Sequence, residues 1–228
     1  SKMILPNTKK HIIVNAGHYD DPDTPHFDDP GAIANQIREA VEVMKIRDRV
    51  VPLLKQAGFA VSSVPDDLDL RESIKWANEK APILNDALAV DIHLNYFSNP
   101  SARGTESFYG KTETSKQIAE ALVNNVAETL GIPNRGAKPD TQTAVGSLGW
   151  IRKTTMWASL IEVCFLTNPE DIKMLHSVDG YEKAARGIVN GICEMFGVPK
   201  LQNLPPPEVG GKDREKIKLQ IIELVNQL

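Results

Sequence analysis

Three residues that can act on a hydrolysable bond lie in or just after apolar, β-branched segments. His18 directly follows the run "HIIVNAG", His93 lies near the end of "AVDIHLNYF", and Glu162 lies within "SLIEVCF". A carboxylate inside a buried strand is costly unless a cationic or catalytic partner meets it. Ligands of open α/β sheets bind outside the carboxyl ends of the strands, so we expect the three side chains to converge there.

Two histidines and one carboxylate, with a position left open for water, form a common catalytic zinc set. If Glu162 acts as the base, the third ligand must come from another segment. Glu39 and Glu42 are the candidates, and their spacing does not choose between them. The residues do not form the compact His-Glu-x-x-His helix motif. The predicted site is therefore assembled from segments that are distant in the sequence.

Strand-like and helix-like segments alternate along the chain and must position these residues. Apolar and β-branched runs predict strands over 11–17, 59–65, 89–97, 104–110 and 159–165. Helical spacing of apolar residues predicts helices over 32–58, 70–86, 115–131 and 180–197, with Pro52 and Pro82 as interruptions. Such alternation indicates a single α/β domain with helices on both faces of the sheet.

The composition changes after Gly197. We expect a catalytic domain over 1–198, a linker rich in proline and glycine over 199–212, and an amphipathic helix over 213–228. That helix needs a partner face, so it is expected to pack or self-associate, and it is expected to continue beyond Leu228.

Bulk properties exclude several classes of protein. A net charge of −4, a pI near 5.8 and no long basic run argue against nucleic-acid binding. No apolar run reaches the roughly 18 to 20 residues that span a bilayer, and "SKMILPNTKK" lacks the apolar core of a signal peptide. Cys164 and Cys193 are too few for a disulfide framework and are expected to be free core thiols.

A set of motifs resembles the zinc-dependent N-acetylmuramoyl-L-alanine amidases of the AmiC/CwlV type, a family of peptidoglycan hydrolases. The stretches that carry the resemblance are "VNAGH", "DPGAIANQIREA", "DIHLNYFSNPSARGTESFYG", "NRGAK", "LGWIRKTT" and "SLIEVCFLTNPED". They occur in family order and together cover roughly residues 10 to 197.

The resemblance implies a twisted, mostly parallel sheet of about six strands and one bound zinc ion. Transferred position by position, the metal ligands are His18, Glu39 and His93, with Glu42 as the fallback, and Glu162 is the catalytic base. The implied reaction cleaves the amide bond between the lactyl group of N-acetylmuramic acid and L-alanine of the stem peptide. Peptidoglycan is thus the expected partner, and action outside the cytoplasm or as a phage-encoded lysin is the expected location.

Other residues carry weaker expectations. Asn95 and Arg103 are candidate substrate contacts, although Arg103 could equally brace a loop. Asn168 is expected to cap the next helix. The loop after His18 is longer than is usual in the family and carries His26, which we expect to be solvated. Two other functions stay open, a zinc peptidase or carboxypeptidase of related architecture and a non-catalytic cell-wall-binding module.

Overall fold

A six-stranded β-sheet forms the centre of the protein, which we analyse in a computed structural model that describes residues 5, 10–19 and 29–201. Its strands are β1 (His11–Ala16), β4 (Ala60–Ser63), β5 (Leu88–Asn95), β6 (Thr105–Tyr109), β7 (Asn134–Pro139) and β8 (Trp157–Phe165), in the spatial order β4-β1-β5-β8-β6-β7. Adjacent strands are parallel except for β6 and β8, which are antiparallel. The predicted mostly parallel sheet is confirmed. Its neighbouring parallel strands β1, β5 and β8 bring the ends near His18, His93 and Glu162 together.

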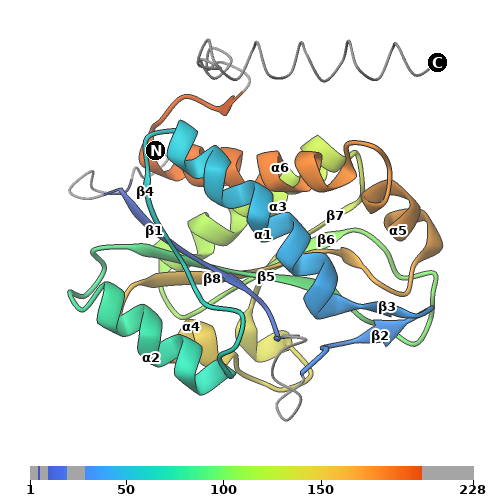
Figure 1. Cartoon of the computed structure of the whole chain (residues 1–228), viewed down its shortest axis with the longest axis horizontal. Helices are drawn as coiled ribbons and strands as arrows, with labels where there is room; N and C mark the ends of the chain where they lie inside the picture. The colour runs from blue at the N-terminus through green and yellow to red at the C-terminus, as the bar shows by residue number, and fades with distance from the viewer. Residues whose placement is uncertain (1–4, 6–9, 20–28, 202–228) are drawn as a thin grey trace, which may run out of the picture.

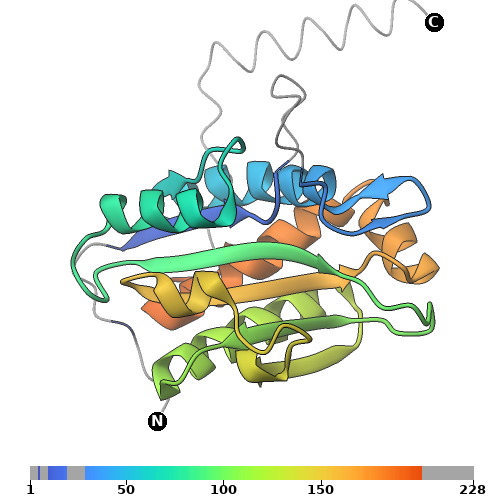
Figure 2. The same ribbon diagram turned by 90° about the horizontal axis from the view of Figure 1, so that it is seen from below.

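Helices cover both faces of the sheet, as predicted (Figures 1 and 2). α1 (Glu39–Gln56), α3 (Glu113–Leu130) and α6 (Gly180–Phe196) pack on one face, and α2 (Leu70–Lys80) and α4 (Gly149–Lys153) pack on the other. Alternate residues of each strand face these two layers. In β1, Ile12 and Val14 join the larger hydrophobic core, whereas Ile13 joins the smaller one.

The segment before α1 differs from the predicted helix over 32–58. It forms a short antiparallel hairpin, β2 (Ile33–Ala34) and β3 (Ile37–Arg38). Its two turn residues, Asn35 and Gln36, have φ angles of 52° and 64°, the left-handed backbone that tight hairpin turns require. Ile33 and Ile37 therefore match a helical spacing without being helical. The helix begins at Glu39 and continues through Pro52 to Gln56 as one element.

Three further elements were not predicted from the sequence. β7 reads "NRGAKP", which has no alternating apolar pattern because it is an edge strand and contains Gly136 at φ 84°. The five-residue α4 and the 3₁₀ turn η1 (Asp140–Gln142) are too short to show a helical period. The predicted end of α3 holds, because Gly131 closes that helix with φ 65°. The helix predicted over 70–86 is shorter: α2 ends at Lys80, before Pro82, and does not resume after it.

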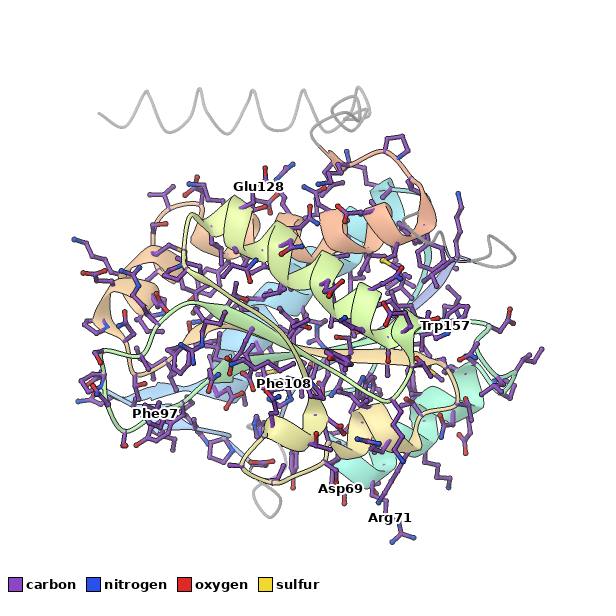
Figure 3. All side chains as sticks on the ribbon, turned by 180° about the vertical axis from the view of Figure 1, so that it is seen from behind. Asp69, Arg71, Phe97, Phe108, Glu128 and Trp157 are labelled. Carbon is purple, nitrogen blue, oxygen red and sulfur yellow. The ribbon has the colours of Figure 1, made fainter. Side chains whose placement is uncertain are left out.

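The carboxyl ends of the central strands define one side of the molecule. Figure 3 labels Phe97, just beyond β5, and Trp157, at the start of β8, on opposite sides of the structure. In the part of the chain that the structure describes, no helix has the length and apolar character needed to cross a membrane.

The chain after α6 keeps contact with the core for a few residues. The backbone N–H of Leu201 donates to the Oδ1 atom of Asn190 at 2.9 Å, and the Leu201 side chain is buried. The start of the predicted linker is therefore packed. The rest of that linker and the predicted helix over 213–228 lie outside the described residues, so both stay predictions.

Candidate active site

His18, Glu39 and His93 converge at the carboxyl ends of β1 and β5. One possible ligand atom from each lies within 4.8 Å of the others. His93 Nδ1 is 2.9 Å from Glu39 Oε1, and His18 Nε2 is 3.3 Å from Glu39 Oε2. The structure thus brings the two predicted histidines to the first residue of α1.

The alternative ligand, Glu42, lies one turn further along α1 and faces elsewhere. Its carboxylate accepts hydrogen bonds from Lys45 Nζ at 2.7 Å, from His176 Nε2 at 2.7 Å and from the Tyr181 hydroxyl at 2.5 Å. His176, directly after α5 (Pro169–Leu175), and Tyr181, in the first turn of α6, thus attach to α1 through Glu42. The geometry therefore favours Glu39 over Glu42 as the residue available to an ion.

The backbone holds the Glu39 carboxylate in place. The Leu94 N–H in β5 donates to Oε1 at 3.0 Å, and the Ala32 N–H donates to Oε2 at 2.9 Å. Both bonds depend on the β2–β3 hairpin, which ends directly before Glu39. A longer helix over 32–58 would have placed the carboxylate in another orientation.

A left-handed backbone conformation positions the first histidine, His18. His18 has a φ angle of 65°, a conformation that side-chain-bearing residues rarely adopt and that is often found at functional sites. The following residue, Tyr19, pairs with Asp29 through two backbone hydrogen bonds of 3.0 Å. This pairing closes the base of the loop that contains His26, a residue outside the described part of the chain. It also brings the Asp29 carboxylate to His18 Nδ1, at 3.0 Å.

Two glycines leave the space that the cluster occupies. A Cβ atom on Gly17 would lie 2.3 Å from His93 Cε1 and Nε2. A Cβ atom on Gly31 would lie 2.5 Å from His18 Cδ2 and 2.7 Å from Glu39 Oε2. Any larger residue at either position would have to move a candidate ligand.

A second layer of carboxylates faces the outer nitrogens of the histidines. Asp29 accepts from His18 Nδ1, and Asp91 Oδ2 lies 3.2 Å from His93 Nε2. Asn15 Nδ2 donates to Asp91 Oδ1 at 2.8 Å. Sequence reasoning missed both aspartates. Asp91 had a usable signal, because a residue two positions before His93 in a strand shares its face.

The charges of the cluster are mutually compensating. Burial opposes the charged form of His93, but Asp91 and Glu39 outweigh it and raise the pKa of His93 well above its usual value. Burial also opposes charge on His18, yet the hydrogen bond to Glu39 raises its pKa. Burial disfavours ionised Glu39, but hydrogen bonds from both histidines hold its pKa well below the usual range. A divalent cation bound here would displace one proton from each imidazole, the one on the nitrogen that faces Glu39.

The donor set fits a zinc ion. Two imidazole nitrogens and a carboxylate oxygen are the ligands of many catalytic zinc sites, which keep one position open. Glu39 and Asp91 are 4% and 2% exposed, and among the described ion pairs only histidines contact them. Two buried carboxylates without a lysine or arginine partner favour the binding of a cation.

Glu162 lies next to this cluster. It is opposite His93 in the β5–β8 register, and its Oε2 atom is buried with no hydrogen-bond partner among the described residues. Burial raises the pKa of Glu162 to about 8, against an attraction to His93 and with a further contribution from nearby carboxylates. An orphaned buried carboxylate oxygen is rare and indicates that a ligand or water belongs beside it.

Another carboxylate extends the row of side chains formed by His93 and Glu162. Glu106 is opposite Glu162 in the antiparallel β6–β8 pair. Its oxygens accept from Asn95 Nδ2 at 2.5 Å, from Arg135 Nε at 2.8 Å and from Lys138 Nζ. These cations lower the pKa of Glu106 against the effect of burial. Glu106 was not predicted, and the candidate substrate contact Asn95 is anchored by it.

Arg103 lies in the loop before β6, and its side chain contacts the first turn of α5. Its Nε atom donates to buried Asp171 at 3.2 Å, and its guanidinium also pairs with Glu170. These contacts brace the loop before β6 against the helix. Asn168 caps that helix as predicted, because its Oδ1 accepts from the N–H groups of Glu170 and Asp171 at 3.0 and 2.9 Å.

A cavity of about 150 Å³ adjoins the cluster of His18, Glu39 and His93 on the side of α2 and α4. Its polar lining includes the side chains of His18 and His93 together with Asp91. Its apolar lining comes from Leu68, Leu70, Leu148, Trp150 and Leu160. The candidate ligands are therefore accessible from a partly apolar cleft, as expected of a site that binds an organic substrate.

Comparison with known proteins identifies sequence relatives of this chain. The chain is 30% identical over 211 residues to an uncharacterized protein of Clostridium perfringens, and 29% identical over 188 residues to the N-acetylmuramoyl-L-alanine amidase LytC of Bacillus subtilis. These matches cover 91% and 81% of this chain but only 57% and 35% of the two relatives.

The fold also matches a solved catalytic domain. The structure superposes on that of CwlV, an N-acetylmuramoyl-L-alanine amidase from Paenibacillus polymyxa, with a TM-score of 0.69 and 28% identity, over 83% of this chain and 99% of that one. The family model described as N-acetylmuramoyl-L-alanine amidase matches residues 12–194. The chain therefore belongs to the Amidase_3 family of N-acetylmuramoyl-L-alanine amidases.

Proposed function

We propose that this chain is a zinc-dependent peptidoglycan hydrolase. It cleaves the amide bond that joins the lactyl group of N-acetylmuramic acid to L-alanine of the stem peptide. The observation that carries the proposal is the unpartnered, buried Oε2 atom of Glu162 beside a cluster of two histidines and a carboxylate. Family membership supports the substrate class.

His18, Glu39 and His93 would hold one zinc ion. When bound, zinc supplies Lewis-acid chemistry, which polarises an amide carbonyl and makes water more acidic. The protein residues hold the reacting groups, exclude bulk water and transfer one proton. A dication at the cluster would also lower the raised pKa of Glu162, so that its carboxylate is ionised near neutral pH.

Glu162 acts as general base and then as general acid. Its carboxylate removes one proton from the water whose oxygen attacks the amide carbon. The C–N bond then breaks, and Glu162 delivers the same proton to the departing nitrogen of L-alanine. The products are a carboxylate on the lactyl group and a stem peptide with a free amino terminus.

Asn95 and Arg103 are proposed as substrate contacts beside this centre. Both already have protein partners, Glu106 for Asn95 and Asp171 for Arg103. The Arg103 side chain is 34% exposed, so one edge of its guanidinium remains open to a stem-peptide carboxylate. Peptidoglycan lies outside the cytoplasmic membrane, and we therefore propose action there, or after release as a phage-encoded lysin.

The test uses the zinc-loaded chain and purified muropeptides with an intact lactyl–L-alanine bond. Mass spectrometry should detect a lactyl-bearing glycan and a peptide with an L-alanine amino terminus. Glu162→Gln should lower the rate by about 10²- to 10⁴-fold while zinc content stays the same. Cleavage within the stem peptide would instead identify a peptidase, and binding without cleavage a wall-binding module.

A further inference from the structure

A relay of three side chains leads from β1 into the candidate metal site. Asn15 in β1 donates to Asp91 Oδ1 in β5 at 2.8 Å, and Asp91 Oδ2 lies 3.2 Å from His93 Nε2. Asn15 is 7% exposed and Asp91 is 2% exposed, so water competes little for these two contacts. Each Asp91 oxygen therefore has one assigned partner.

The surroundings of His93 leave one nitrogen for an ion. Gly17 lies against the Nε2 edge of the ring so closely that a Cβ there would be 2.3 Å from Nε2. The same edge faces Asp91. The opposite nitrogen, Nδ1, faces Glu39 at 2.9 Å, and the other oxygen of that carboxylate faces His18. Packing and hydrogen bonding thus assign different tasks to the two nitrogens.

His18 has the reverse arrangement. Its Nδ1 faces Asp29 at 3.0 Å, and its Nε2 faces Glu39 at 3.3 Å. The two histidines therefore present opposite nitrogens to the same carboxylate. A carboxylate on the outer nitrogen is the usual device that sets the tautomer and ring orientation of a metal-binding histidine.

We infer that Asp91, oriented by Asn15, is a positioning residue for His93: it keeps the proton on Nε2 and the lone pair of Nδ1 directed at the metal. The inference rests on the proposed zinc site and deepens it. It also predicts that His93 binds zinc through Nδ1, whereas His18 binds it through Nε2 with its proton on Nδ1.

The first measurement is the zinc affinity of the purified full chain, by competition with a chromogenic chelator. Asp91→Ala should weaken binding by about 10- to 100-fold, the usual cost of losing such an outer partner. The exchange Asn15→Asp with Asp91→Asn should restore most of the affinity. Asn at position 91 can accept from His93 through its oxygen and donate to Asp at position 15 through its nitrogen, so a polar contact with each neighbour is kept.

The matched control is Asp66→Asn, which removes a carboxylate that pairs with the Nη atoms of Arg47 at 2.6 and 2.8 Å, not with a histidine. It should lower the melting temperature and leave the zinc affinity unchanged. A general loss of stability would weaken zinc binding in both aspartate variants and would not respond to the exchange.

The second measurement needs no variant. In the zinc-loaded wild-type chain with ¹⁵N-labelled histidine, long-range NMR correlations should show a protonated Nε2 on His93 and a protonated Nδ1 on His18. Zinc on His93 Nε2, or wild-type affinity in Asp91→Ala, would overturn the inference. Both readouts use zinc alone, so failure to cleave muropeptides would refute the proposed function without touching this result.

Discussion

Gly17→Ala should disable the metal site by a single methyl group. The new Cβ would lie 2.3 Å from His93 Cε1 and Nε2, whereas ordinary contact begins at 3.4 Å. The imidazole must therefore move by about 1 Å, the difference between these distances. Gly17 does not have a left-handed φ angle, so alanine suits its backbone and the effect is steric.

A shift of this size is large for a metal ligand, because coordination distances are held to within about 0.2 Å. It would also stretch the 2.9 Å contact between His93 Nδ1 and Glu39 Oε1. We expect zinc affinity to fall by at least about 10- to 100-fold, which corresponds to about 1.4 to 2.8 kcal/mol. Muropeptide cleavage at limiting zinc should fall in parallel.

Chelator competition measures the zinc affinity, and calorimetry measures the stability of the metal-free chain. Gly58→Ala is the control: its Cβ meets no atom within 4 Å, but its φ of 89° strains any larger residue. Gly58→Ala should lose stability and keep its zinc affinity. If Gly17→Ala binds zinc as tightly as the parent, the proposed role of His93 as a ligand is wrong.

Three further outcomes follow from the site and its surroundings. In the metal-free chain, folded Glu162 keeps its proton up to about pH 8, while an unfolded glutamate loses it near pH 4.5. The folded state thus binds more protons in that window, so the unfolding free energy should fall as pH rises from 5 to 8. The raised pKa of His93 also makes the unfolding free energy fall as pH rises. Urea titrations should show a smaller fall between pH 5 and 8 in Glu162→Gln than in the parent. An equal fall would contradict the raised pKa of Glu162. Glu42→Gln should lower the free energy of unfolding in urea by about 1 to 3 kcal/mol, because a buried acceptor loses its charge. Its zinc affinity should stay near that of the parent. A large loss of zinc affinity in this variant would identify Glu42 as the ligand. Arg103→Ala should lower the melting temperature by exposing an uncompensated Asp171, and a rise in KM for muropeptides is expected only if Arg103 also contacts substrate.

Much of the architecture was predictable because it depends on local periodicity. Apolar runs located five of the six sheet strands, and helical spacing located α1, α2, α3 and α6. Local end signals also held, such as Gly131 after α3 and the Asn168 cap of α5. These features need only contacts within a few residues of one another, so a single sequence contains the information.

The chemistry of the site was predictable in kind for a related reason. Ligands of open α/β sheets bind at the carboxyl ends of the strands, so histidines and a glutamate near such ends were expected at the same edge of the sheet. The family motifs then selected His18, Glu39, His93 and Glu162 as candidates.

Only the tertiary structure decided how those residues are used. The family motifs favoured Glu39 over Glu42, but the physical reason that Glu39 meets the histidines is a hairpin whose Asn35–Gln36 turn delays the helix until residue 39. The roles proposed for Asp91 and Glu162 depend on strand register. They also depend on contacts between segments that are 50 or more residues apart, such as His93 with Glu39. Side-chain type and period are local properties, whereas the environment of a charge is set by distant parts of the chain.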